Sequence, residues 1–249
     1  MSVVLSAQGL RKSYGALTVT DDLSLDLHQD ELLAVIGPNG AGKTTLINQL
    51  SGQLRPDAGR VVLAGRDISD QSMAQRVHLG MARTFQITSI LPGFSVLENV
   101  ALAVQARSGS SFRFFRAAAG QRRLNDAAMA HLAEVDLDAD AQRRAADLSH
   151  GKQRQLELAI ALATDPHILL LDEPLAGTGG AEAARLVALM QRLKARHSIL
   201  LIEHDMRAVF ALANRIAVMV YGQIIATGTP DEIRANPRVR AAYLGQESV

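Results

Sequence analysis

The segment Gly-Pro-Asn-Gly-Ala-Gly-Lys-Thr at residues 37–44 constrains the fold more than any other part of this sequence. It follows the apolar run Leu32–Ile36, which predicts a strand buried on both faces. It precedes "TLINQLSGQL", which predicts a helix. A glycine-rich loop between a buried strand and a helix lets backbone N–H groups and the helix N-terminus face a polyphosphate. The sequence therefore predicts an α/β protein with a phosphate-binding loop (P-loop).

Two side chains of the P-loop have specific expected roles. Lys43 can reach the β- and γ-phosphates of a nucleoside triphosphate, and the Thr44 hydroxyl can bind Mg²⁺. The nucleotide is expected to contact the whole loop and the first turn of its helix. These residues are Gly37, Pro38, Asn39, Gly40, Ala41, Gly42, Lys43, Thr44 and Thr45.

Two acidic residues follow a second apolar run. Ile168–Leu171 predicts a buried strand, and Asp172 and Glu173 come directly after it. Alone, such a pair is more often a solvated strand end or a helix cap. Beside a P-loop, Asp172 can hold Mg²⁺ through water, and Glu173 can deprotonate the attacking water. The sequence therefore predicts a nucleoside triphosphatase.

A third motif, Ser149-His150-Gly151-Lys152, lies at the start of a predicted helix. Together with the residues up to Pro174, it resembles the signature motif of the ATP-binding cassette (ABC) ATPases. The resemblance implies that the signature segment (Ser149–Lys152) binds the γ-phosphate of an ATP held by a second cassette, through backbone amides at the helix N-terminus. A capped helix without a ligand would explain Ser149 but not a glycine in the first turn.

Further residues match the order of motifs in that family. Tyr14 matches the aromatic residue that stacks on adenine, and Gln86 the glutamine that contacts Mg²⁺ and couples to the membrane partner. His204 matches the switch histidine that touches the γ-phosphate. None of the three would be informative in isolation. The resemblance covers nearly the whole chain and implies a catalytic set of Lys43, Glu173 and His204.

The resemblance also implies the architecture. The expected fold is a P-loop NTPase (ABC ATPase) core with an antiparallel β subdomain and an inserted α-helical subdomain. We expect one nucleotide-binding domain over residues 1–249, with the core and β subdomain at about 1–86 and 165–249 and the helical subdomain at about 87–164. Period-2 alternation predicts antiparallel strands early in the chain. The other expected elements are helices over 95–106, 126–137 and 180–196, strands over 59–68 and 198–202, a hairpin turning at residues 221–222 and one capped helix within 229–245.

Composition excludes several classes of protein. The formal net charge of +1 argues against a surface that coats nucleic acid, and the absence of cysteine excludes disulfides and thiolate metal sites. No apolar run reaches the roughly 18 residues that a membrane helix requires, and the first residues lack a signal-peptide core. We therefore expect a soluble protein that meets a membrane only through a partner.

Several stretches resemble the cassettes of hydrophobic (branched-chain) amino acid importers, among them "RTFQI", "EHDMRAVFALANRI" and "YGQIIATGTPDEI". This resemblance implies ATP and Mg²⁺ as ligands, a second cassette in a homo- or heterodimer, two membrane permease subunits and, indirectly, a periplasmic solute-binding protein. It places the chain at the cytoplasmic face of the inner membrane. Urea or amide importers and the lipopolysaccharide-export cassette share the pattern and remain alternatives. A soluble ABC ATPase of DNA repair or translation is less favoured, because no long coiled-coil insertion or second cassette is present.

Two motifs depart from the usual family pattern. The signature segment has His150 and Lys152 where Gly or Tyr and Gln are usual, which adds donors near a phosphate. The loop Ala176–Gly180 lacks the polar side chain expected at position 179, so the communication step across the cassette dimer is expected to differ.

A basic and aromatic stretch at 107–123 holds five arginines (107, 113, 116, 122 and 123) and three phenylalanines, without an acid before Asp126. Such a composition is compatible with membrane headgroups or nucleic acid. A solvated loop and helix is about twice as favoured.

Overall fold

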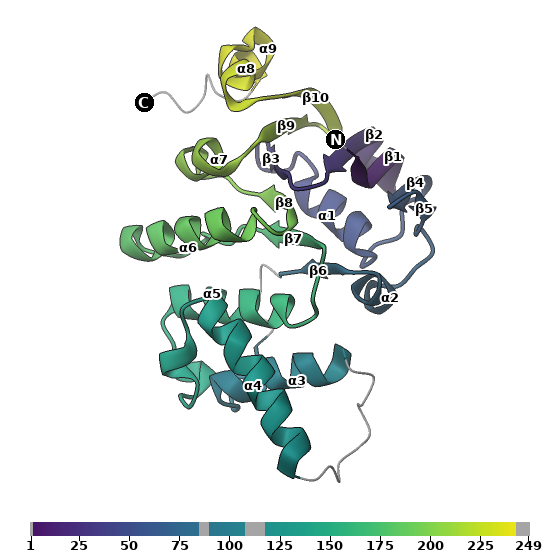
Figure 1. Cartoon of the computed structure of the whole chain (residues 1–249). Helices are drawn as coiled ribbons and strands as arrows, with labels where there is room; N and C mark the ends of the chain where they lie inside the picture. Colours follow the sequence, from purple (N-terminus) through teal and green to yellow (C-terminus); the bar gives the residue numbers. More distant parts are fainter. Residues whose placement is uncertain (1, 85–89, 108–117, 243–249) are drawn as a thin grey trace.

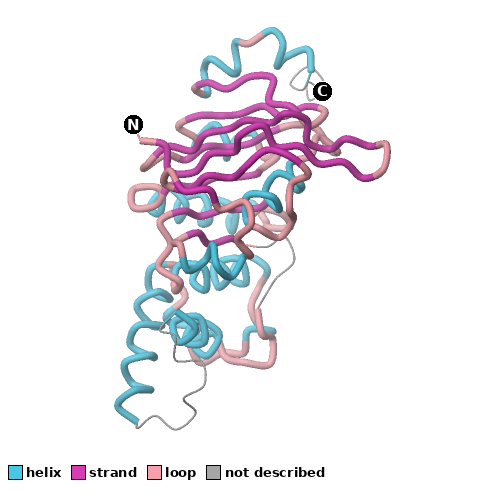
Figure 2. The backbone as a smooth tube through the Cα atoms, turned by 90° about the vertical axis from the view of Figure 1, so that its right-hand side faces the viewer, coloured by secondary structure: helices cyan, strands magenta, loops and turns pink. Residues whose placement is uncertain are grey.

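The structure, a computed structural model, describes residues 2–84, 90–107 and 118–242. Two β-sheets lie in one part of the molecule, and a group of helices projects from them at the end away from the N-terminus (Figures 1 and 2). Within the described residues, no helix combines the length and the apolar character needed to cross a membrane. The mixed α/β architecture confirms the predicted fold class.

The larger sheet has six strands in the order β10-β9-β3-β8-β7-β6. All neighbours are parallel except the edge hairpin of β9 and β10. Because parallel strands end at the same edge, the residues that follow β3, β7 and β8 converge there. The bounds are β3 (Leu32–Ile36), β6 (Met81–Arg83), β7 (Ile168–Asp172), β8 (Ser198–Ile202), β9 (Arg215–Val220) and β10 (Gln223–Gly228).

The smaller sheet is antiparallel, with the order β2-β1-β4-β5. Helix α1 (Lys43–Ser51) lies between the two sheets, because Leu46, Ile47 and Leu50 share one hydrophobic core with leucines of β1 and β2 and with one face of β3 and β7. The P-loop is therefore held between both sheets. The strands are β1 (Val3–Tyr14), β2 (Leu17–His28), β4 (Ala58–Leu63) and β5 (Arg66–Asp67).

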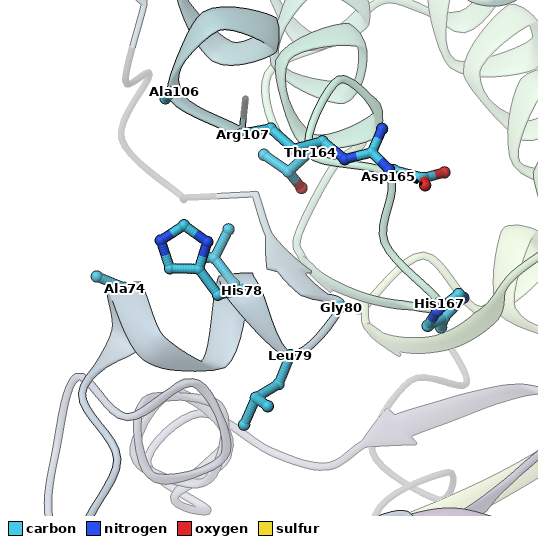
Figure 3. Close-up of a pocket in the computed structure, with 10 residues that line it drawn as sticks. Ala74, His78, Leu79, Gly80, Ala106, Arg107, Thr164, Asp165 and His167 are labelled. Atoms are coloured by element: carbon cyan, nitrogen blue, oxygen red, sulfur yellow. Dashed lines mark hydrogen bonds and ion pairs between the residues drawn. The ribbon is translucent and has the colours of Figure 1, made fainter. Parts of the chain in front are cut away.

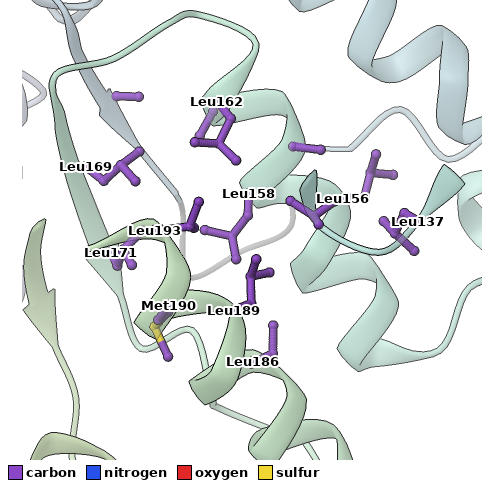
Figure 4. Close-up of a cluster of buried hydrophobic side chains, with 14 of the residues drawn as sticks. Leu137, Leu156, Leu158, Leu162, Leu169, Leu171, Leu186, Leu189, Met190 and Leu193 are labelled. Carbon is purple, nitrogen blue, oxygen red and sulfur yellow. The ribbon is translucent and has the colours of Figure 1, made fainter. Parts of the chain in front are cut away.

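The opposite face of the larger sheet is covered by helices. Leu169 and Leu171 of β7 point to this face, whereas Ile168 and Leu170 point to α1, as the alternation of a strand requires. Leucines of α5 and α6 meet there in one continuous core (Figure 4). The helices that build this layer and the projecting group are α3 (Val96–Arg107), α4 (Ala118–Glu134), α5 (His150–Leu162) and α6 (Gly180–Leu193), with short 3-10 turns at Asp138–Asp140 and Ala145–Asp147.

Four short helices complete the described part of the fold. Asp205 caps α7 by accepting hydrogen bonds from the N–H groups of Arg207 and Ala208. Thr229 and Glu232 form a capping box at the start of α8. Residues of α7, α8 and α9 pack with β3 and β9 in a third small core. The bounds are α2 (Met73–His78), α7 (Met206–Leu212), α8 (Pro230–Ala235) and α9 (Pro237–Ala242).

Most expected elements are confirmed, including the strands at 32–36 and 198–202 and the hairpin that turns at Tyr221-Gly222. Two expectations are wrong. The single helix within 229–245 is two helices, because Asn236, which precedes a proline, adopts an extended conformation. The strand over 59–68 is two strands, because Ala64 and Gly65 form a turn with positive φ angles. Three elements, α2, β6 and α7, were not predicted, because they are too short to show a clear period in the sequence.

Candidate functional site

The P-loop conformation requires glycine where the chain approaches other backbone. A Cβ atom at Gly37 would lie 2.0 Å from the carbonyl oxygen of Met219. At Gly42, where φ is 104°, it would lie 2.4 Å from the carbonyl oxygen of Val19. The N–H of Gly222 also donates to the carbonyl oxygen of Ala41 at 2.9 Å. The loop is therefore held against β2 and the β9–β10 turn.

Lys43 begins α1, and its side chain turns back onto the loop. Its Nζ atom donates to the carbonyl oxygens of Gly37 at 2.6 Å and Pro38 at 3.0 Å. Burial lowers the pKa of Lys43, while the charges of Glu173 and Asp172 act in the opposite direction. A cation thus lies inside the P-loop, close to two carboxylates, with neutral carbonyls as its hydrogen-bond acceptors. Thr44 beside it is exposed, and Thr45 is half-buried.

Asp172 ends β7 and is only 2% exposed. Its Oδ2 atom accepts a hydrogen bond from Nη2 of Arg83 at 3.0 Å. Burial raises the pKa of Asp172, and the Arg83 guanidinium opposes this shift. Arg83 also donates to Asn48 and Ser51 of α1, so it links β6, α1 and the end of β7. Arg83 was not predicted from the sequence, because only the fold brings it to Asp172.

Glu173 and His204 follow neighbouring parallel strands and face each other. Glu173 has a φ of 48°, unusual for a residue with a side chain, and its N–H donates to the carbonyl oxygen of Ile202 at 2.9 Å. Its Oε1 atom lies 4.0 Å from Nδ1 of His204. The His204 side chain is 63% exposed, so the imidazole is accessible from solvent. Backbone strain of this kind is concentrated at functional sites.

Glu203 is a second residue that sequence analysis missed. It is 1% exposed, and its Oε1 atom accepts a hydrogen bond from the N–H of Leu175 at 2.9 Å. Its Oε2 atom accepts from the N–H groups of His204 at 2.9 Å and Asp205 at 3.2 Å. The available signal was a carboxylate between an apolar strand and the predicted switch histidine.

The signature segment begins α5, with Ser149 as the N-cap residue. The Ser149 hydroxyl donates to Oε1 of Glu182 at 2.7 Å, and the N–H of Gly151 donates to Oε2 at 3.2 Å. A Cβ atom at Gly151 would lie 2.6 Å from Cδ of Glu182, so only glycine lets the carboxylate approach this closely. A carboxylate of α6 therefore occupies the donors at the start of α5.

Two other residues of the signature segment point elsewhere. Nζ of Lys152 pairs with Oδ2 of Asp140 at 2.6 Å, and this hydrogen bond is the largest cause of the lowered pKa of Asp140. The expected extra phosphate donor at position 152 is thus held by Asp140. His150 is exposed.

The fold brings some of the predicted residues together and leaves others apart. Lys43, Asp172 and Glu173 interact electrostatically, and Glu173 faces His204. In the described part of the chain, Ser149 and Gly151 bond to α5 itself and to Glu182, not to the P-loop.

Two further predictions concern Tyr14 and Gln86. Tyr14 ends β1 with 54% of its surface exposed, and Nζ of Lys12 lies 5.9 Å from its ring centroid. Gln86 lies outside the described residues.

The two departures noted in the sequence differ in how far the structure describes them. Gly179 is the N-cap of α6 and makes no side-chain capping bond, and a Cβ atom there would meet no atom within 4 Å. The departure therefore costs α6 a cap but removes no packing. In the basic stretch, Arg107 pairs with Asp165, and Arg122 and Arg123 are exposed. Residues 108–117 lie outside the description.

A cavity of about 880 Å³ lies elsewhere, between α2, the end of α3 and the segment before β7 (Figure 3). His78, Gly80, Arg107, Asp165 and His167 are among the residues that line it. Gly80 and His167 precede β6 and β7, so the cavity lies at the opposite strand ends from Asp172. It is not part of the P-loop site.

Comparison with known proteins agrees with this geometry. Residues 20–176 match the family model described as ABC transporter, and residues 223–249 match that described as branched-chain amino acid ATP-binding cassette transporter. The chain is 38% identical to the high-affinity branched-chain amino acid transport ATP-binding protein LivG of Salmonella typhimurium, over 98% of each chain. It is 37% identical to the corresponding protein BraF of Pseudomonas aeruginosa, again over 98% of each.

Solved structures give the same result. The crystal structure of an ABC transporter cassette in its ADP conformation matches with a TM-score of 0.86 at 29% identity, covering 98% of this chain and 100% of the other. A nucleotide-free cassette matches with a TM-score of 0.85 at 30% identity, covering 97% and 99%. These matches confirm the enzyme class predicted from the motifs. The chain belongs to the ABC transporter family, as an ATP-binding subunit whose ATPase activity is coupled to transport.

Proposed function

We propose that this chain powers the import of branched-chain or related amino acids through partner membrane subunits. The observation that carries the proposal is the 38% identity, over 98% of both chains, to a high-affinity branched-chain amino acid transport ATP-binding protein. The match of residues 223–249 to a model of the same transport group supports it. A cassette for urea, amides or lipopolysaccharide would share the ATP chemistry, so the cargo needs its own test.

In the proposed site, the P-loop binds the phosphates of ATP. Backbone N–H groups and the start of α1 face the anion, and Lys43 turns from the carbonyl oxygens of Gly37 and Pro38 to the β- and γ-phosphates. A phosphate oxygen is the stronger acceptor because it is charged. Tyr14 stacks on the adenine from the exposed end of β1.

The donor set fits Mg²⁺, which prefers hard oxygen ligands and keeps several waters. The Thr44 hydroxyl and the Asp172 carboxylate would hold it, with Gln86 as a third proposed ligand. Arg83 bonds to Oδ2 of Asp172, which leaves Oδ1 for the metal or its water. When bound, Mg²⁺ would neutralise charge on the β- and γ-phosphates.

Hydrolysis follows from the positions of Glu173 and His204. Glu173 accepts a proton from water, the water oxygen attacks the γ-phosphorus in line, and the bond to the β-phosphate oxygen breaks to give ADP and phosphate. His204, 4.0 Å from Glu173 Oε1, supports the γ-phosphate and the attacking water. Positioning supplies most of the catalysis in such reactions.

The proposed second half of the site belongs to a neighbouring cassette. Ser149 has one hydroxyl hydrogen and Gly151 one amide hydrogen, and Glu182 accepts both. The γ-phosphate of the ATP held by the neighbour can be bound only when Glu182 releases them. ATP-driven closure of a homo- or heterodimer therefore includes an exchange of one anion for another.

The remaining parts of the proposal concern organisation. The chain is one nucleotide-binding domain over 1–249, with the core and β subdomain at about 1–86 and 165–249 and the helical subdomain at about 87–164. It works with two membrane permease subunits, at the cytoplasmic face of the inner membrane, and indirectly with a periplasmic solute-binding protein.

The test is purification of the tagged chain from membranes of its native host. We expect integral membrane subunits to co-purify, and the ATPase activity of the reconstituted complex to rise when a solute-binding protein loaded with leucine, isoleucine or valine is added. Stimulation by urea, by amides or by lipopolysaccharide instead would replace the cargo assignment. Failure to recover any membrane subunit would contradict a transport role.

A further inference from the structure

We propose that Glu203 is a positioning residue that holds the general base Glu173 and the switch residue His204 in one rigid unit. The inference rests on the roles given to Glu173 and His204 in the proposed function. Glu203 itself touches no substrate, because its side chain is fully buried behind the turn.

The first observation is how the end of β7 is attached to β8. The parallel ladder of β7 and β8 ends at the pair Asp172 and Ile202. Beyond it, the N–H of Glu173 donates to the carbonyl oxygen of Ile202 at 2.9 Å, and the N–H of Leu175 donates to Oε1 of Glu203 at 2.9 Å. The Glu203 carboxylate thus replaces the backbone acceptor that the ladder no longer provides. Glu173 is therefore anchored through its own N–H at the end of β8 and, two residues later, through Leu175 to the residue that follows β8.

The second observation is what the other carboxylate oxygen does. Oε2 of Glu203 accepts hydrogen bonds from the N–H groups of His204 and Asp205. Asp205 then caps α7, so the turn that carries His204 is fixed on both sides. One carboxylate therefore anchors the backbone of both loops. In this arrangement His204 Nδ1 lies 4.0 Å from Oε1 of Glu173 and 3.7 Å from Oε2 of Glu203 itself.

The third observation is chemical. Only a side chain with two acceptor atoms and no donor can satisfy N–H groups on both of its ends. Glutamine offers one acceptor and would turn an NH₂ group toward an N–H. Aspartate keeps the charge and can serve the adjacent N–H groups of its own turn, but it is one methylene shorter than the bridge to Leu175 requires. Glu203→Asp should therefore remove the hydrogen bond to Leu175 and keep those to the N–H groups of His204 and Asp205.

The test is steady-state ATP hydrolysis by the full chain in its transporter complex. We expect Glu203→Asp to lower kcat about 10- to 100-fold, since displacement of a catalytic group by about 1 Å has effects of this size. The KM for ATP and the Kd of a labelled ATP analogue should stay within about threefold, because the P-loop is not altered. The thermal unfolding midpoint reports whether the variant is folded.

A matched control is Glu31→Asp. Glu31 is also a buried glutamate beside the larger sheet, and it accepts a hydrogen bond from the N–H of His28 at 2.7 Å, but it precedes β3, at the opposite strand ends from Glu203. Its shortening should lower stability and leave kcat within about threefold of the unchanged protein. Equal losses of kcat in both variants would show a general effect of shortening a buried glutamate and would overturn the proposal.

A double-mutant cycle with Glu173→Gln adds the decisive comparison. If Glu203 acts by positioning Glu173, Glu203→Asp should lower kcat by clearly less once Glu173 is already Gln, and the loss that remains should be the part exerted through His204. A full further loss of 10- to 100-fold would overturn the proposal.

If Glu203→Asp does not fold, the same double-mutant cycle is measured with Glu203→Gln. Normal turnover of Glu203→Asp beside a slow Glu173→Gln overturns this inference alone. Near-normal turnover of Glu173→Gln overturns the proposed function and this inference with it.

Discussion

The P-loop and the start of α5 are both proposed phosphate sites at helix N-termini, but each holds a different internal ion. In the P-loop, the Lys43 ammonium donates to loop carbonyls. At the start of α5, the Glu182 carboxylate accepts from Ser149 and Gly151. The first proposed site contains a cation, which would attract an incoming phosphate, and the second contains an anion, which would compete with one.

This difference separates binding from activation. Phosphate entry into the P-loop needs only the rotation of one flexible side chain that gains a charged acceptor. Phosphate entry at α5 requires that two donors, each with one hydrogen, leave a carboxylate. We therefore expect the isolated chain to bind ATP at its P-loop but to hydrolyse it only slowly. Closure against a neighbour should set the rate.

The largest expected effect tests whether Glu173 is the general base. Glu173→Gln should lower kcat about 10²- to 10⁴-fold, the scale for loss of a general base, because Gln cannot accept the proton of water. ATP binding, measured with a labelled analogue, should be unchanged, since Glu173 adds no donor to the P-loop. Rapid turnover in this variant would show that another residue is the general base.

The next effect compares the two phosphate sites directly. Lys43→Ala should weaken ATP binding by the isolated chain about 10- to 100-fold, because a hydrogen bond from a charged donor contributes about 1.5–3 kcal/mol. Ser149→Ala should leave that affinity unaltered and instead reduce ATP-driven dimerisation, measured by size-exclusion chromatography with ATP. Equal loss of monomer affinity in both variants would mean that one chain holds both halves of a pocket.

A smaller effect tests the competing anion. Glu182→Gln should lower the ATP concentration needed for dimerisation about three- to tenfold, because a neutral amide competes less well with phosphate than a carboxylate does. Glu232→Gln, at an exposed carboxylate that caps α8, is the control and should not shift it. If Glu182→Gln raised the required concentration, Glu182 would support α5 in the closed state rather than occupy its donors.

The smallest effect concerns the loop between the two sites. Gly179 is the N-cap of α6, the helix that carries Glu182, and it has room for a side chain. Gly179→Asn should raise the free energy of unfolding by only a few tenths of a kcal/mol, the usual difference between these residues at an N-cap. Gly179→Ala, which adds a Cβ but no acceptor, should not stabilise the protein. Urea unfolding measures both, and a gain with Ala alone would indicate packing rather than capping.

Local motifs were predicted most accurately from the sequence. The strand over Leu32–Ile36, the hairpin turn at Tyr221-Gly222 and the Ser149 cap were predicted to the residue. Each depends on neighbours within a few positions along the chain. The prediction of a single helix within 229–245 was wrong, although the reason is visible in the sequence. Pro237 disfavours a helical conformation at the residue before it.

The residues that support the site could not be predicted from the sequence in the same way. Arg83 reaches Asp172 across 89 positions, Ser149 reaches Glu182 across 33 and Leu175 reaches Glu203 across 28. An arginine or glutamate in isolation gives no indication of a partner that far away. Each of these pairs exists because parallel strands or packed helices place distant segments side by side.

By itself, the sequence determined which groups are proposed to bind phosphate and to deprotonate water, because glycines before Lys43 and acids after an apolar strand form local motifs. Only the tertiary structure decided which ions those groups hold before nucleotide arrives. It placed Lys43 on its own loop, Glu182 on the signature segment and Glu203 beneath Glu173 and His204. The physical reason is that hydrogen bonds between side chains and distant backbone form only after the core has brought the strands and helices together.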